Sequence, residues 1–206
     1  MKTIMMFVAS LMLICCSTQQ NKIGIFEGSS DVGNPQLKGS MSYNPSSEVY
    51  TLTGGGTNMW ADNDEFFMAW KEIDGDFSIS AKVAFEGNGV NAHRKIGVIV
   101  RESLVGNSKY ADIALHGDGL TSLQYRDVMG GETKEVIAVN QAPDHLTLER
   151  IGNKITMKVA TGEFSDIPAG EIEFDLPATC YVGIFICSHE ADVLEKAYFT
   201  DVRLVK

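Results

Sequence analysis

"KIGVIVRESLVGNSKYADIALHGDGLTSLQYR", residues 95 to 126, contains three strand-length runs in which apolar residues occupy every second position. Alternate residues of a β-strand lie on the same face of its sheet. Ile96, Val98 and Val100 therefore share one face of the first run, and Lys95 and Arg101 lie on the other. The runs at 110–116 and 122–126 alternate in the same way, with a Gly-Asp-Gly turn signal between them. The stretch predicts three strands of an antiparallel sheet with one face in a core.

The same period extends along most of the chain. In "FSISAKVAF" (77–85), Phe77 and Ile79 lie on one face and Lys82 lies on the other. About a dozen runs of this kind follow one another along the chain. Short glycine-containing turns separate them, and Gly152-Asn153 has the spacing of a two-residue hairpin. No window of 12 or more residues has a convincing helical period. The sequence therefore predicts an all-β protein, a two-sheet antiparallel sandwich or jelly roll.

The N-terminus has the pattern of a bacterial lipoprotein signal peptide. Lys2 precedes an apolar run from Ile4 to Ile14, which is too short to span a bilayer. Leu13-Ile14-Cys15-Cys16 resembles a lipobox, with Cys16 as the acylated residue. We expect a signal peptide at 1–15, a polar tether at 16–30 and a β-sandwich domain at 31–206, held by its lipid in the envelope of a Gram-negative bacterium, on the outer membrane facing the periplasm or the cell surface. The alternative is an ordinary signal peptide with incidental cysteines.

Charge and cysteine positions restrict the partners and the cross-links. The net charge of the 206-residue chain is −10, and removal of residues 1–15 deletes only Lys2 among the charged residues, which makes it −11. Nucleic-acid binding requires a concentrated basic face, so we exclude it. Cys180 and Cys187 lie seven residues apart on one predicted strand, too far apart for a disulfide. We expect two free, mostly buried thiols.

Several blocks resemble a known family. "TNMWADNDEFFMAWKEIDGDFSISAKV", "AHRKIGVIVRESL", "YADIALHGDGLTSLQYR" and "YVGIFICSHEADVLEKAYFTDVRL" are similar to a bacterial domain of the concanavalin A-like lectin/glucanase superfamily, over roughly residues 32 to 205. Such domains occur in lipoproteins, fused to Tol-type β-propellers or appended to glycoside hydrolases. The resemblance implies a jelly roll with one convex and one concave face. It leaves function open, because the superfamily holds lectins, polysaccharide-binding modules and hydrolases.

The carboxylate motifs argue against a glucanase active site. Glucanases of this fold carry E-x-D-x-x-E on one strand, but "EIDGDF" has Phe77 at the position of the second glutamate. "EIEFDL" (171–176) aligns its acidic residues on one face, a pattern more typical of a solvated surface. Asp62, Asp64 and Glu65 are the oxygen donors that a structural Ca²⁺ would use, although the chain has no D-x-D-x-D-G loop. We therefore expect no cofactor, with Ca²⁺ as a minor alternative.

A polar row on the three runs around residues 95–126 is the main candidate site. If these strands are neighbours, their polar positions line the concave face above a floor of Gly97, Ile99 and Ala114. Planar donors and acceptors beside an aromatic ring suit sugar hydroxyls. The predicted ligand-binding residues are Lys95, Arg101, Tyr110, Asp112, His116, Gln124, Arg126 and Trp60, with Trp70 and Tyr125 as further candidate platforms. The alternative is that Arg101 and Asp112 pair on a solvated face and that a loop covers Ile99.

Three functions follow from these features. The first is a non-catalytic, carbohydrate-recognising lipoprotein that binds glycan on its concave face. The second is a glycoside-acting hydrolase or lyase that uses Glu65, Glu102 or Asp112 with His116 as general acid or base. The third is a structural or protein-binding module of an envelope complex.

Overall fold

The structure is a computed structural model that describes residues 23–163 and 165–206; the predicted signal peptide and Cys16 lie outside these ranges. The described residues form sixteen strands and no helix, and none of their segments is a helix that could cross a membrane. The strands are β1 (Gly28–Val32), β2 (Ser40–Asn44), β3 (Val49–Gly56), β4 (Met59–Trp60), β5 (Asn63–Asp64), β6 (Phe66–Asp74), β7 (Phe77–Phe85), β8 (Lys95–Arg101), β9 (Tyr110–His116), β10 (Thr121–Arg126), β11 (Lys134–Ile137), β12 (His145–Ile151), β13 (Lys154–Ala160), β14 (Ile167–Glu173), β15 (Thr179–Cys187) and β16 (Glu190–Val205).

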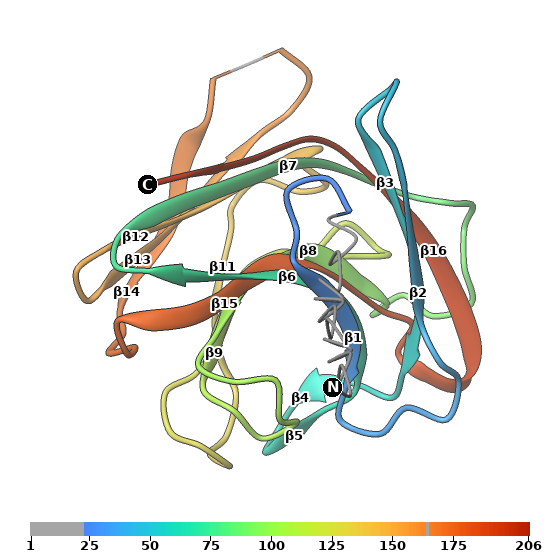
Figure 1. The fold of residues 1–206 in the computed structure, drawn as a ribbon, viewed down its shortest axis with the longest axis horizontal. Helices are drawn as coiled ribbons and strands as arrows, with labels where there is room; N and C mark the ends of the chain where they lie inside the picture. Colours follow the sequence, from blue (N-terminus) through green and yellow to red (C-terminus); the bar gives the residue numbers. More distant parts are fainter. Residues whose placement is uncertain (1–22, 164) are drawn as a thin grey trace, which may run out of the picture.

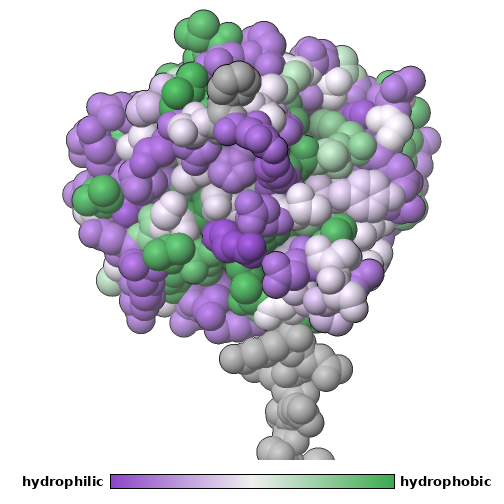
Figure 2. Space-filling model, turned by 90° about the horizontal axis from the view of Figure 1, so that it is seen from above, coloured by the Kyte–Doolittle hydropathy of each residue, from purple (hydrophilic) through white to green (hydrophobic). Residues whose placement is uncertain are grey.

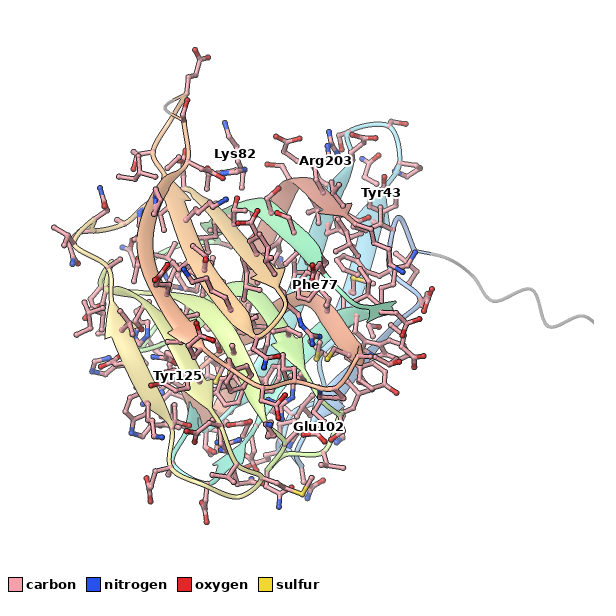
Figure 3. The ribbon with its side chains drawn as sticks, turned by 90° about the vertical axis from the view of Figure 1, so that its left-hand side faces the viewer. Tyr43, Phe77, Lys82, Glu102, Tyr125 and Arg203 are labelled. Atoms are coloured by element: carbon pink, nitrogen blue, oxygen red, sulfur yellow. The ribbon has the colours of Figure 1, made fainter. Side chains whose placement is uncertain are left out.

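Two seven-stranded sheets lie face to face (Figures 1 and 3). One has the order β1-β6-β15-β8-β9-β10-β11, and the other has the order β14-β13-β12-β7-β16-β3-β2, with every pairing antiparallel. The first sheet is curved, and the short β4–β5 hairpin lies beside the end of its curve (Figure 1). This confirms the predicted all-β jelly-roll sandwich. We call the face of the first sheet that lies away from the core the concave face.

The core between the sheets follows the predicted alternation. On β7, Phe77 and Ile79 are buried in the core, whereas Lys82 projects outward, as Arg203 does from β16 (Figure 3). Ile96, Val98 and Val100 belong to the same core. The outer surface seen from above in Figure 2 is mainly hydrophilic, with apolar residues in small groups. Burial of alternate side chains from two sheets therefore accounts for the fold.

Some boundaries differ from the predicted ones. The domain begins before residue 31, because Phe26 is almost fully buried against Tyr50 and β1 starts at Gly28. The apolar residues at 23–26 form no strand but a single bridge between Ile23 and Phe26. Residues 26–30, which were predicted as tether, therefore belong to the folded domain. The hairpin at Gly152-Asn153 is confirmed, with Gly152 at a φ of 59°.

Candidate functional site

The predicted polar row lies on one face of adjacent strands. β8 and β9 pair with Lys95 opposite His116 and Ile99 opposite Asp112. β9 and β10 pair with Asp112 opposite Gln124. Since residues opposite each other in an antiparallel pair share a face, all predicted members on these three strands point to the concave side. The three strands are therefore neighbours, and their polar residues share one face, as the sequence predicts.

Arg101 and Arg126 do not line a groove, because both side chains are completely buried. Asp64 lies between them: Arg101 Nη1 donates to Asp64 Oδ2 at 2.8 Å, and Arg126 donates to Oδ2 and Oδ1 at 2.8 and 2.7 Å. Asp64 is also fully buried. Two guanidinium groups on one carboxylate form a buried charge cluster, so the prediction that these arginines contact ligand is corrected: they hold the protein together.

The remaining guanidinium donors fasten three loops to the sheet. Arg126 donates to the carbonyl oxygens of Ala61 (2.8 Å), Ser108 (3.1 Å) and Gly131 (2.9 Å), and Arg101 donates to Val105 (2.8 Å). A guanidinium carries five N–H donors in a rigid plane and therefore satisfies several carbonyls at once. The arginines fix the β4–β5 hairpin and the two loops beside it over one end of the concave face.

An apolar cluster lies beneath this cover. It contains Ile99 and Ala114 of the predicted floor and Tyr110 of the predicted row, packed with Met59 from β4 and Phe185 from β15. The hydroxyl of Tyr110 donates to the carbonyl oxygen of Met59 at 3.3 Å. Tyr110 is fully buried and therefore is not the sugar platform that the sequence predicts. The β4–β5 hairpin covers Ile99, and this explains why β8 is apolar on its concave face as well as on its core face.

The uncovered end of the concave face holds a pocket of about 280 Å³. Four predicted residues line it, and they come from the hairpin and three successive strands: Trp60, Lys95, His116 and Gln124. Its other lining residues are Asn58, His93, Leu120, Glu135 and His189. Trp60 remains 36% exposed, whereas its hairpin neighbours Met59 and Asp64 are buried. The anchored hairpin thus holds an indole ring at the mouth of the pocket.

Three histidines from distant parts of the chain meet at this pocket. The ring centroid of His93 lies 5.9 Å from that of His116 and 5.6 Å from that of His189. Burial, followed by the positive charge of Lys95, lowers the pKa of His116 to about 4 and also lowers the pKa of His189. Both imidazoles are therefore neutral at pH 7 in the unliganded protein.

Lys95 is a buried cation with one hydrogen-bond partner among the described residues. Its Nζ donates to Asn58 Oδ1 at 2.6 Å, and the residue is 2% exposed. Burial lowers its pKa, while Cys187 and Asp112 act in the opposite direction. The same Asn58 oxygen accepts the backbone N–H of Met59 at 2.8 Å. Asn58 therefore couples the hairpin to the ammonium group.

Asp112 and Gln124 lie opposite each other on β9 and β10, but only Gln124 lines the pocket. Asp112 is fully buried, and neither of its carboxylate oxygens has a hydrogen-bond partner in the described parts of the chain. Burial raises the pKa of Asp112 well above its usual range, although Lys95 opposes the shift. Gln124 Nε2 lies 3.3 Å from His116 Nε2 and 3.2 Å from Ser122 Oγ. Asp112 is thus beneath the pocket rather than on its wall, which corrects its predicted contact with ligand.

The other candidates lie elsewhere. Glu65 accepts hydrogen bonds from Thr57, and neither Glu65 nor Glu102 lines the pocket. Trp70 packs edge-on against Tyr181, and Tyr125 packs edge-on against Phe174 on the core side. Asp64 is occupied by the arginines, and within 23–163 and 165–206 no group of His, Cys, Asp and Glu is placed to hold a metal ion. Both Cys180 and Cys187 are free and buried, as predicted.

Sequence reasoning did not assign Asn58, His189 or Glu135 to the site. Asn58 and His189 lie in loops, where strand periodicity gives no direction. Glu135 lies on β11, opposite Gln124, so its position in "KEVI" would have identified it once β11 was placed beside β10. His93 precedes β8 by two residues, His116 ends β9 and His189 follows β15 by two residues, so the antiparallel pairing brings all three to the same end of the sheet.

Comparison with known proteins gives the fold. No protein-family model matches the sequence, and no curated protein matches it either. A functionally unknown protein from Saccharomyces cerevisiae is similar in structure (TM-score 0.64, 15% identity, 86% of this chain and 95% of that chain). So are lectin II from Ulex europaeus (0.54, 9%, 87% and 98%) and the carbohydrate-binding module CBM66 from Bacillus subtilis (0.51, 14%, 87% and 96%). The chain shares the fold of these proteins, a two-sheet antiparallel jelly-roll sandwich.

Proposed function

We propose that this protein binds a glycan, without cleaving it, in the pocket at the open end of the concave face. The observation that carries the proposal is the combination of a half-exposed indole, Trp60, with fixed polar groups on Lys95, His116 and Gln124. A sugar ring presents an apolar C–H face and a rim of hydroxyls, so it is bound by an aromatic platform beside planar donors and acceptors.

The size and support of the pocket fit this ligand. Its volume of about 280 Å³ is close to the lower end of ligand pockets, roughly 300 Å³. It suits one sugar residue of a longer chain whose neighbours continue along the rim. The Asp64 cluster and Asn58 fix the hairpin that carries Trp60, so ligand binding costs little conformational entropy in this hairpin. The similar folds of a plant lectin and a carbohydrate-binding module are consistent with the proposal.

Catalysis is the second candidate, and the carboxylates disfavour it. Glycoside hydrolases use two carboxyl groups roughly 5 to 9.5 Å apart at one bond. Among the described residues that line the pocket, Glu135 is the only carboxylate. Because a neutral His116 is chemically able to act as a base, we include product detection in the test. Release of reducing ends or unsaturated sugars from a bound polysaccharide would assign an enzyme instead.

We further propose that acylation of Cys16 anchors the domain to the outer membrane of a Gram-negative envelope. A chain extends by at most about 3.6 Å per residue, so the ten residues from Cys16 to the buried Phe26 would place the domain within about 35 Å of the bilayer. Metabolic labelling with a radioactive fatty acid tests this. The label is expected in the wild type and absent from Cys16→Ser, and retention of the label in Cys16→Ser would reject Cys16 as the site.

The binding test is a glycan array followed by titration calorimetry on plant, algal and host polysaccharides. Trp60→Ala is expected to weaken binding about 10-fold, because an aromatic contact contributes about 0.5 to 1.5 kcal/mol beyond its buried area. The matched control is Ile151→Ala, an exposed apolar residue in the β12–β13 hairpin. No binding to any polysaccharide, or equal affinity of Trp60→Ala and wild type, would overturn the proposal. An interaction with an envelope protein that survives Trp60→Ala would favour the protein-binding module.

A further inference from the structure

The pocket concentrates basic groups in a protein that is otherwise acidic. The chain carries a net charge of −10 and only four histidines, yet three of those histidines and Lys95 line this one pocket. They come from the loop before β8, from β8 itself, from the end of β9 and from the β15–β16 turn. Against them, Glu135 on the exposed edge strand β11 is the one carboxylate among the described lining residues.

Lys95 is a buried ammonium group without a paired anion in the described structure. An ammonium carries three donors, and the Asn58 oxygen accepts one of them. Asp64 is bound by the two arginines, and Asp112 forms neither an ion pair nor a hydrogen bond with Lys95. A buried charge without a partner costs several kcal/mol, so an anionic ligand gains more here than at the surface.

We propose that the bound sugar is acidic and that its carboxylate or sulfate oxygens accept hydrogen bonds from Lys95 Nζ. This inference rests on the proposed glycan binding and specifies its chemical class. The amide of Asn58 directs its oxygen to Lys95 and to the backbone N–H of Met59, which leaves its nitrogen as a second donor at the same wall. Trp60 receives the apolar face of the ring.

The histidines make this binding depend on protons. The positive charge of Lys95 opposes protonation of His116, as do His93 and His189 once they are protonated, and Asp118 favours it. Glu190 favours protonation of His189. The acidic and thiol groups around Lys95 are Asp112, Asp64, Glu135 and Cys187. A bound anion favours the protonated imidazoles, so binding takes up protons, and affinity rises as pH falls from the ordinary histidine value of about 6.5 towards the value of about 4 for His116.

The experiment uses matched acidic and neutral ligands with the full chain. Oligogalacturonate is compared with its methyl ester, and κ-carrageenan oligosaccharide is compared with its desulfated form. We expect one acidic ligand to bind at least 10-fold more tightly than its neutral counterpart, and the pair that shows this distinguishes carboxylate from sulfate. Equal binding of acidic and neutral forms overturns the inference but leaves glycan binding intact. Binding of no saccharide overturns both proposals.

Two substitutions of opposite sign locate the anion. Lys95→Met keeps most of the length of the side chain, and it is expected to reduce acidic-ligand affinity at least 10-fold more than neutral-ligand affinity. Glu135→Gln removes the opposing charge from an exposed position and is expected to tighten acidic-ligand binding about 3-fold at low salt. Glu171→Gln, on the exposed strand β14, is the matched control with no expected effect. If Lys95→Met fails to fold, the Glu135→Gln result decides alone, and an unchanged or weaker affinity overturns the inference.

Zinc is included as a probe, because imidazole is also a common metal ligand. ZnCl₂ is titrated against the wild type and His93→Gln. The inference is overturned if the wild type binds zinc at micromolar concentration, His93→Gln does not, and saccharide binds only when zinc is present. The pocket would then be a metal site rather than an anion site. Saccharide binding that is unaffected by EDTA supports it.

Discussion

Asp64→Asn tests whether the buried charge cluster holds the concave-face loops. The substitution preserves shape but leaves Arg101 and Arg126 buried without a counter-ion. The structure loses the charge from three hydrogen bonds of 2.7 to 2.8 Å, and removal of one partner from a buried ion pair costs about 3 to 5 kcal/mol. Because the total stability of a domain is about 5 to 15 kcal/mol, this is a large fraction.

Urea denaturation followed by tryptophan fluorescence measures the loss. With a slope of about 2 kcal/mol per molar, a loss of 4 kcal/mol lowers the midpoint by about 2 M. Asp62→Asn is the matched control, since Asp62 lies two residues away in the same hairpin and is exposed. Its expected change is below about 0.5 kcal/mol. If both variants unfold at the same urea concentration, the cluster contributes nothing and our account of Arg101 and Arg126 is wrong.

Three further outcomes are expected. Gly97→Ala should destabilise the domain by at least about 3 kcal/mol in urea, because its Cβ would lie 1.8 Å from the carbonyl oxygen of Ile113 on β9; an unchanged midpoint contradicts this. His116 has a folded pKa of about 4 against about 6.5 unfolded, so its contribution to stability is present above pH 6.5 and decreases as pH falls towards 4. The wild type should therefore lose about 3 kcal/mol more than His116→Gln over that interval, and parallel pH profiles would reject the shift. Cys187, whose pKa burial raises to about 11, should resist Ellman's reagent at pH 8 until urea is added, in protein whose Cys15 and Cys16 are replaced by serine, and rapid native labelling would contradict its burial.

The Asp64 cluster also links stability to binding. Ala61 directly follows Trp60 and Asp64 lies four residues after it, and both accept hydrogen bonds from Arg126. Loosening the hairpin releases the indole from the mouth of the pocket. Asp64→Asn should therefore weaken glycan binding as well as unfold more easily, whereas Trp60→Ala should weaken binding alone. The two variants separate a residue that positions the site from one that contacts the ligand.

The direction of each side chain was predictable from sequence because strand alternation is a local property. Ile96 and Val98 had to lie in the core, and Lys95, His116 and Gln124 had to lie together on the other face once their strands were neighbours. The free state of Cys180 and Cys187 followed from the same geometry, since seven residues of extended chain separate them.

Which part of that face is open was decided by tertiary structure. Arg101 and Lys95 share a strand face, yet one is sealed beneath the β4–β5 hairpin and the other lines a pocket. The hairpin lies about forty residues earlier in the chain, and it is held there by a carboxylate whose partners, Arg101 and Arg126, lie on other elements. Alternation determines the face to which a side chain points, but only long-range packing determines what covers that face. Sequence periodicity therefore located the face, and the folded loops located the site on it.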